Sequence, residues 1–137
     1  MTAIVIELPG IPQGKGRPRF VRATGHAFTP AKTRSYESML QGAALDVMNG
    51  TPPLEGPLEA TVEAHFPVPA SWSKSKRAAA LLGVTRPTTK PDVDNLLKIL
   101  DALNAVVFHD DKQIVVATIS KHYSERPRLV VTVGRAA

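Results

Sequence analysis

Residues 90–103 read KPDVDNLLKILDAL and join a polar loop to a predicted helix. One side of this helix is apolar, with Leu96, Ile99, Leu100 and Leu103 at helical spacing. We therefore expect that side to pack on a hydrophobic core. Asp94 is a favoured N-cap, so the helix is predicted to begin there. Lys98 follows Asp94 by four residues and precedes Asp101 by three, which places its side chain on the acidic side of the helix.

Four aspartates lie around this helix: Asp92, Asp94, Asp110 and Asp111. Aspartate is almost never fully buried unpaired, so these carboxylates are expected to face solvent, a cation or both. Oxygen ligands suit hard divalent ions such as Mg²⁺, which leaves part of its coordination shell to substrate phosphate. For Asp94 taken alone, a purely structural N-cap explains the residue at least as well.

The change from loop to helix allows these carboxylates to converge. Side chains two residues apart on an extended segment point to opposite faces, but the backbone turns between Asp92 and Asp94. The helix is expected to be about four turns long, so the returning chain can bring Asp110 and Asp111 near its start. Together with Lys98, this arrangement resembles a site in which metal ions and a lysine cleave a phosphodiester.

The overall composition favours a polyanionic partner. The chain has 137 residues, with 17 Lys and Arg against 12 Asp and Glu, so a local acidic site sits in a basic protein. Positive surface gathers a polyanion through phosphate contacts, although a basic balance also arises from an ordinary solvated surface. Cysteine is absent, which excludes disulfides, zinc-thiolate sites and thiol nucleophiles. No apolar stretch approaches the roughly 20 residues that span a bilayer, so we expect one soluble cytoplasmic domain, residues 1–137, and no membrane partner.

The pattern of elements predicts an α+β fold, with a small mixed sheet of about four strands and helices packed on it. Strands are expected at residues 3–8, 58–66, 113–123 and 129–133, the last two as a C-terminal hairpin. A small hairpin is predicted from 20–22 and 26–28. Helices are expected from Thr29-Pro30 to Gly50, with its apolar side toward the core, and from 73 to 82. The predicted core positions of the first helix are Tyr36, Met39, Leu40, Ala43, Ala44, Val47 and Met48.

Basic residues cluster in three segments that flank the acidic motif. The flexible loop at residues 13–19 interleaves cations with glycine and proline, a composition that suits either a phosphate backbone or a solvated surface. The other two segments are the predicted helix at 73–82 and the loop at 84–90. The candidate DNA-binding residues are Lys15, Arg17, Arg19, Lys74, Lys76, Arg77, Arg86 and Lys90. Trp72 is interpreted as a packing anchor, with stacking on nucleic acid as the alternative.

Three segments closely resemble the signature of the RusA family of Holliday-junction resolvases. They are KPDVDNLLK at 90–98, DAL at 101–103 and FHDDKQIV at 108–115. The N-terminal GKGRPRF at 14–20, Thr29-Pro30 and Tyr36-Glu37 also look like members of this family, including phage and prophage members. The resemblance therefore spans nearly the whole chain.

The resemblance implies a RusA-like homodimer of bacterial or phage origin that binds four-way DNA junctions. With Mg²⁺ or Mn²⁺, it would nick two strands symmetrically, in DNA recombination and repair. Carried over by position, the catalytic residues would be Asp92, Asp94, Lys98 and Asp111, with the three aspartates on the metal. The roles of Asp110 and of the four histidines stay open.

Two other functions remain as alternatives. A non-catalytic junction-binding protein would use the same basic residues, but it would have little reason to keep carboxylates beside a polyanion. A small-molecule phosphohydrolase would use the same metal chemistry, but the basic loops argue against it.

Overall fold

The computed structural model describes residues 3–16, 19–21, 23–28 and 30–137. The helix start predicted at Thr29 and the candidate Arg17 lie outside these residues. The elements run β1 (Ile4–Pro9), β2 (Arg19–Val21), β3 (His26–Phe28), α1 (Ala31–Met48), β4 (Leu58–Phe66), α2 (Lys74–Leu81), α3 (Val93–Lys98), the 3₁₀ helices η1 (Ile99–Leu103) and η2 (Asp111–Gln113), β5 (Ile114–Tyr123) and β6 (Arg128–Arg135).

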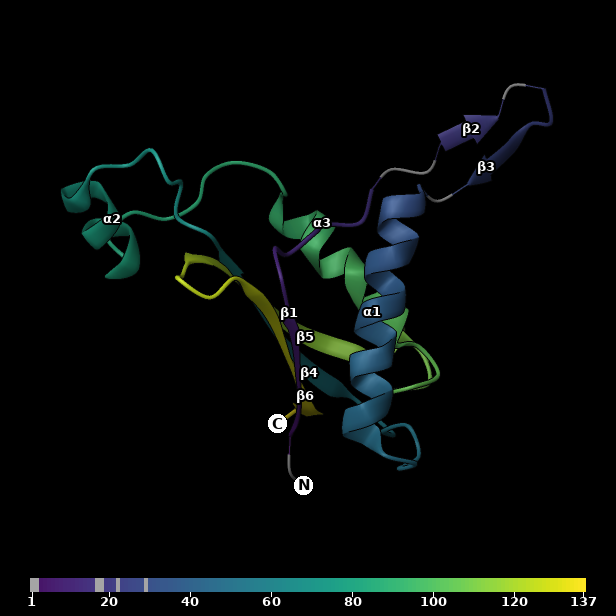
Figure 1. Cartoon of the computed structure of the whole chain (residues 1–137). Coiled ribbons are helices and arrows are strands. Elements are labelled where there is room, and N and C mark those ends of the chain that lie inside the picture. The colour runs from purple at the N-terminus through teal and green to yellow at the C-terminus, as the bar shows by residue number, and fades with distance from the viewer. Residues whose placement is uncertain (1–2, 17–18, 22, 29) are drawn as a thin grey trace.

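The main sheet has four strands in the order β1-β6-β4-β5. β6 pairs antiparallel with β1 and β4, whereas β5 pairs parallel with β4. The predicted mixed sheet of an α+β fold is therefore confirmed. The small β2–β3 hairpin forms at the predicted place and projects away from the main sheet (Figure 1).

The predicted C-terminal hairpin is wrong, because β4 lies between β5 and β6. The link at residues 124–127 crosses the end of β4, where the Ser124 N–H donates to the Phe66 carbonyl at 2.9 Å. Four extended residues reach up to about 14 Å, more than the roughly 10 Å across two strand spacings. Alternating residues identify a strand but not its partner, so the sequence favoured the simpler pairing.

Helix α1, helix α3 and η1 cover one face of the sheet (Figure 1). Alternate residues of β4 enter the core on that face, as predicted for the strand at 58–66. The acidic helix contributes its predicted apolar side, Leu96, Ile99, Leu100 and Leu103, all buried. Helix α1 contributes a narrower set: Thr33, Tyr36, Leu40, Ala44 and Met48.

Two core positions predicted on α1 are wrong. Met39 is 53% exposed and Val47 is 43% exposed. The buried residues of α1 recur every three or four positions along one line, so residues to either side of that line stay at the surface. The C-terminus of the helix follows the prediction: Asn49 adopts a left-handed conformation, and Gly50 follows with φ of 81°.

The acidic helix starts earlier than predicted and changes type partway. Asp92 is its N-cap residue, and Asp94 lies in the first turn. An aspartate is favourable at either position, because both lie at the positive end of the helix dipole. The α-helical hydrogen bonding ends at Lys98, and the chain continues as η1 instead of a single α-helix of about four turns. None of the described helices is long and apolar enough to cross a membrane.

Central burial on β4 predicts a large stability difference between two matched substitutions. Val62→Ala removes two methyl groups from a fully buried site, whereas Val116→Ala removes them from a strand residue that is 45% exposed. We expect Val62→Ala to lower the free energy of unfolding by about 2–3 kcal/mol and Val116→Ala by less than about 1 kcal/mol. Urea unfolding followed by circular dichroism measures both, and equal losses would contradict the assigned core.

Candidate functional site

A short segment, Gly14-Lys15-Gly16, lies between α1 and α3 and fixes their approach. The Gly16 N–H donates to Thr33 Oγ1 at 3.0 Å, and the Lys15 N–H donates to the Asn95 carbonyl at 2.9 Å. A Cβ built on Gly14 would lie 2.9 Å from the Pro91 Cβ, and one on Gly16 would lie 2.8 Å from Thr33 Oγ1. Glycine is therefore required at both positions by close packing. We call residues 14–16 the N-terminal strap.

The Lys15 side chain joins three separate parts of the chain. Its ammonium contacts Asp101 Oδ2 on η1 and lies 3.6 Å from Glu37 Oε2 on α1. Burial acts to lower the pKa of Lys15, but the two carboxylates more than offset this and raise it. Burial and Asp101 raise the pKa of Glu37, while Lys15 acts to lower it. Lys15, a predicted DNA contact, is thus engaged in an internal ion-pair cluster, and its side chain is 24% exposed.

Beside the strap lies a pocket of about 580 Å³. One wall comes from the strap and the other from the start of the acidic helix. The lining residues are Gly14, Lys15, Gly16, Lys90, Pro91, Asp92 and Asn95. The pocket therefore brings together Asp92, a predicted metal ligand, and Lys90, a predicted DNA contact.

Asp94 and Lys98 lie together on the exposed side of α3. Their charged atoms are 3.8 Å apart, and the two side chains are 67% and 61% exposed. An exposed pair at this spacing contributes little to stability, typically about 0.3–0.5 kcal/mol. Both groups are therefore available to a ligand at little energetic cost.

Asp111 lies beyond the other end of the α3–η1 element. Its backbone N–H donates to Asn104 Oδ1 at 2.8 Å. Burial raises the pKa of Asp111, and a hydrogen bond with Asp110 raises it further. The backbone N–H of Lys112 and the bond with Asp111 lower the pKa of Asp110. Of these two neighbouring carboxyls, Asp111 is therefore the one that binds a proton more readily.

Asp110 has a clear structural role that its sequence context left open. Its side chain accepts from the Lys112 N–H at 2.9 Å, which caps the short helix η2. Gln113 completes this capping box, because its side-chain oxygen accepts from the Asp110 N–H at 3.1 Å. The same oxygen accepts from the His109 N–H at 2.7 Å. The amide of Gln113 also donates to the carbonyls of Leu54 and Gly56, both at 3.0 Å. These bonds hold the loop that carries Asp111.

The structure does not gather the predicted metal ligands into a ready cluster. Among the residues described, no group of three or more His, Asp and Glu side chains is arranged to hold a metal ion. Asp92 and Asp94 lie at the start of α3, and Asp111 contacts residues near the end of η1. Asp101 lies between these two ends and influences Asp111 electrostatically. Asp92 and Asp94 thus lie at one end of the α3–η1 segment, and Asp111 lies beyond the other end.

The other predicted DNA contacts lie on α2 and the following loops. Lys74 and Lys76 are exposed, and the Lys76 ammonium lies 4.0 Å from the ring centroid of Trp72. Trp72 packs edge-on against Tyr123, with their ring centroids 5.2 Å apart, which is consistent with its interpretation as a packing anchor. Arg77 is half-buried on α2, Arg86 and Lys90 are exposed in the loops, and only the backbone of Arg19 is described.

Sequence reasoning missed Glu37, Asn104 and Gln113. Asn104 and Gln113 position the Asp111 loop through side-chain hydrogen bonds to the backbone, and those from Gln113 to Leu54 and Gly56 join residues far apart in sequence. Tyr36-Glu37 was noted only as a point of family resemblance, and no pattern around Glu37 on α1 predicts its contact with Lys15. The capping-box spacing from Asp110 to Gln113 was a readable signal, because a Gln three residues after a cap residue is typical of that motif.

Comparison with known proteins matches most of this chain to one protein family. The family model "Endodeoxyribonuclease RusA" matches residues 9–134. The chain is also 39% identical over 140 residues to "Uncharacterized protein YqaN" of Bacillus subtilis (strain 168), a match that covers 97% of this chain and 96% of that protein. The family match includes the strap, the acidic helix and the Asp110-Asp111 pair.

The close packing of Gly14 predicts opposite effects of two glycine substitutions. Gly14→Ala forces apart the strap and the start of α3, so we expect it to lower the free energy of unfolding by about 1–3 kcal/mol. Gly42→Ala adds a methyl group on α1 with no atom within 4 Å, and should stabilise by about 0.5–1 kcal/mol. Thermal unfolding compares the two, and a neutral Gly14→Ala would refute the close contact.

The ion-pair cluster predicts a pH-dependent loss of stability in Lys15→Met. Glu37 has a folded-state pKa raised above its ordinary value of 4.5, and removing Lys15 raises it further. Protonated Glu37 stabilises the folded protein fully below the pKa that this residue has in the unfolded chain. That stabilisation is lost as the pH rises through the pKa of Glu37 in the folded protein. We expect a deficit of about 1–2 kcal/mol at pH 7 that shrinks toward pH 4.

The matched control for this prediction is Lys32→Met, which removes an exposed lysine from α1. Urea unfolding of wild type and both variants at pH 4, 5.5 and 7 measures the effect. A deficit independent of pH, or one equal to that of the control, would show that Lys15 does not compensate Glu37 and Asp101.

Proposed function

The chain belongs to the RusA endodeoxyribonuclease family, and from that premise we propose that it is a metal-dependent, structure-selective endonuclease that resolves four-way DNA junctions. It would make paired symmetric nicks in DNA recombination and repair, as one domain spanning residues 1–137. The observation that carries the proposal is the exposed group of Asp92 and Asp94 at the start of α3 and Lys98 at its end, inside the matched segment.

The proposed metal ligands are Asp92, Asp94 and Asp111. All three offer carboxylate oxygens, the donors that Mg²⁺ and Mn²⁺ prefer, and the first two are exposed at a helix start. When bound, the ion would polarise a phosphoryl oxygen and lower the pKa of a water molecule. Since the three carboxylates are not gathered in the described structure, we expect the ion and the DNA phosphate to draw them together.

Lys98 is the proposed catalytic lysine. Its ammonium is exposed and lies 3.8 Å from Asp94, so it can leave that partner for a phosphate at little cost. A cation beside the scissile phosphate stabilises charge that develops in the transition state. Asp110, by contrast, would act through its cap on η2, which holds the Asp111 loop in place.

DNA binding is assigned to basic residues around the acidic helix. The segments before that helix, α2 and the loop after it, contain the basic residues Lys74, Lys76, Arg77, Arg86 and Lys90. Phosphate contacts from such residues give an affinity for DNA that depends on salt concentration. Lys15 is left out of this set, since it is held by Asp101 and Glu37. Paired nicks across a junction need two active sites, so we propose a homodimer with twofold symmetry.

A non-catalytic junction-binding protein is the second candidate. It explains the basic residues equally well. The exposed carboxylates at Asp92 and Asp94 argue against it, because they repel a polyanion unless a cation neutralises them.

Substitution of the three aspartates should separate cleavage from binding. With Asp92→Asn, Asp94→Asn or Asp111→Asn, we expect cleavage of a labelled four-way junction to fall by at least about 100-fold with affinity kept, since removing negative charge does not weaken attraction to DNA. The matched control is Asp46→Asn, which alters an exposed aspartate on α1.

The assay compares four-way, forked and linear DNA with Mg²⁺ and with EDTA, and maps the nicks. Full activity in EDTA, or full activity in all three variants, would refute the metal site. Cleavage of linear DNA at the same rate would refute structure selectivity.

A further inference from the structure

Strand β5 has a free backbone edge. It is the last strand of the main sheet, and among the described residues no strand lies beyond it. Its pairing with β4 is regular over residues 116–123, after a register shift that skips Val115. The Lys121 carbonyl faces away from β4, since it accepts from Arg86 Nε at 3.1 Å. Alternate residues of a strand direct their backbone groups to the same edge, so Ala117 and Ile119 also direct an N–H and a C=O outward.

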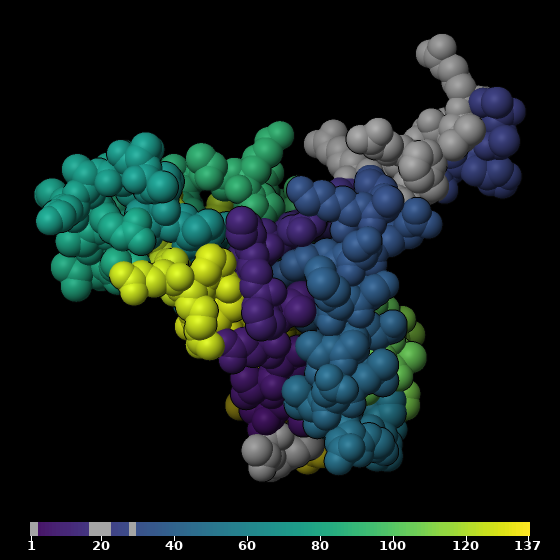
Figure 2. Space-filling model, viewed as in Figure 1, coloured from purple at the N-terminus to yellow at the C-terminus, as the bar shows by residue number. Residues whose placement is uncertain are grey.

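The free part of this edge is suited to a further strand. Residues 116–120 read VATIS, with neither a charge nor a proline, and the first three are exposed. Charges, prolines or a covering element are the usual means by which an edge strand avoids pairing. The opposite edge strand, β1, has such protection, because it contains Glu7, ends at Pro9 and lies against α1 (Figure 2).

The acidic helix runs past β5 in the opposite direction. Just before this helix, the Thr89 carbonyl accepts from the Lys121 ammonium, near the end of β5. After η1, the Asp111 N–H binds Asn104, and β5 then begins at Ile114. Asp92 and Asp94 therefore lie toward the end of β5, whereas Asp111 lies before its start. Within one chain, the length of the strand separates them.

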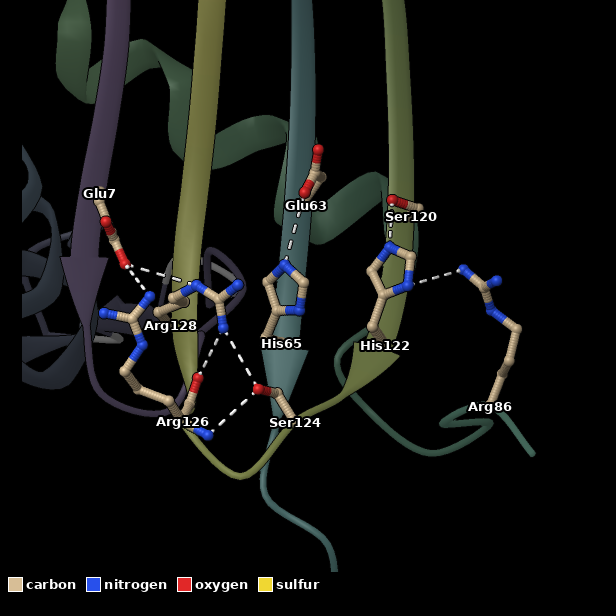
Figure 3. A network of polar contacts seen from close by, with 9 residues as sticks. All are labelled: Glu7, Glu63, His65, Arg86, Ser120, His122, Ser124, Arg126 and Arg128. Carbon is tan, nitrogen blue, oxygen red and sulfur yellow. Dashed lines mark hydrogen bonds and ion pairs between the residues drawn. The ribbon is translucent and has the colours of Figure 1, made fainter. Parts of the chain in front are cut away.

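The two ends of β5 also differ in charge. Asp110 and Asp111 precede the strand, and Lys112 leaves this end with a net negative charge. The other end is basic, with Lys121 on the strand and Arg86 beyond its outer edge (Figure 3). Antiparallel pairing of two copies of β5 places each acidic end beside a basic end, which is favourable at both ends. Parallel pairing would instead bring like charges together.

We propose that two copies of this chain pair antiparallel through β5, and that Asp111 of the partner subunit completes the metal site of Asp92 and Asp94. Pairing about a twofold axis at Ala117 or Thr118 satisfies the free backbone groups of Ala117 and Ile119. The partner's Asp111 precedes its own β5, so it lies toward the end of this chain's β5, where Asp92 and Asp94 are.

This inference rests on the proposed function and adds which chain supplies the third carboxylate. It agrees with the finding that a single chain, over its described residues, gathers no cluster of three ligands. A twofold axis perpendicular to the joined sheet keeps each face of the sheet on its own side. The α3 helices of both copies therefore cover the same face, which places two sites side by side for paired nicks.

Single cysteines test the strand pairing, because the chain has none of its own. Opposed residues of an antiparallel pair have Cα atoms about 4.5–5.5 Å apart, within the range of a disulfide. We expect Ala117→Cys or Thr118→Cys to give a covalent dimer on mild oxidation. Ser38→Cys, at an exposed position on α1, is the matched control and should stay monomeric on a denaturing gel. Cross-linking no faster than this control in both variants would overturn the β5 interface.

Heterodimers of two inactive variants test the shared metal site. One subunit carries Asp94→Asn and the other Asp111→Asn, and two affinity tags select the mixed dimer. With a shared site, one of the two centres keeps all its carboxylates, so junction nicking should return to about half the wild-type rate, from parents lowered at least about 100-fold. The control heterodimer of Asp92→Asn with Asp94→Asn damages both centres and should stay inactive. A first heterodimer as inactive as its parents would overturn the shared site.

A third measurement needs no activity. A heterodimer with Asp94→Cys in one subunit and Asp111→Cys in the other is treated with a short bifunctional maleimide, and we expect a link between the subunits. A link that forms only within a chain carrying both substitutions would overturn the proposal. An inactive wild type would overturn the proposed function, while the two cysteine tests would still decide whether β5 pairs and whether the partner's Asp111 lies beside Asp94.

Discussion

The contact of Lys15 with Asp101 and Glu37 determines how the acidic helix lies on the protein. It joins the N-terminal strap to η1 and to α1, three parts of the chain that are far apart in sequence. The backbone bond from Lys15 to Asn95 and the close packing of Gly14 on Pro91 fix the start of α3 at the same time. Asp92 and Asp94 therefore lie at a helix start whose position is set by packing. Removing the Lys15 ammonium would leave two partly buried carboxylates without a compensating charge, which destabilises the fold.

Most of the basic residues proposed to contact DNA lie on α2 and the loop after it, apart from the carboxylates of this helix. Asp92 and Asp94 are exposed at the start of α3, and the Asp110-Asp111 loop, whose backbone Gln113 holds, lies beyond the end of η1. Basic residues of α2 and the following loop reach round the edge of the sheet to the opposite face, where Arg86 meets His122. A polyanion attracted to the basic side would meet the carboxylates only with a cation present. This separation explains why a basic chain carries a local acidic site.

Much of this arrangement was predictable from sequence. The strand at 58–66 was predicted correctly because its alternation has a period of two, and the apolar side of the acidic helix because its leucines recur at helical spacing. The place of β4 between β5 and β6 was not predictable, since alternation names no partner strand. The role of Lys15 was missed for a similar reason. A lysine in a glycine-rich loop looks like a phosphate contact until its distant carboxylate partners are known.

The convergence of Asp92, Asp94 and Asp111 on one metal ion is the central claim, and a crystal of the protein with Mn²⁺ and a four-way junction tests it most directly. We predict an anomalous scattering peak about 2.0–2.3 Å from carboxylate oxygens of Asp92 and Asp94, with Asp111 drawn toward it. Such a crystal would contradict the account if it showed junction DNA bound beside α3, saturating Mn²⁺ and no peak at these carboxylates.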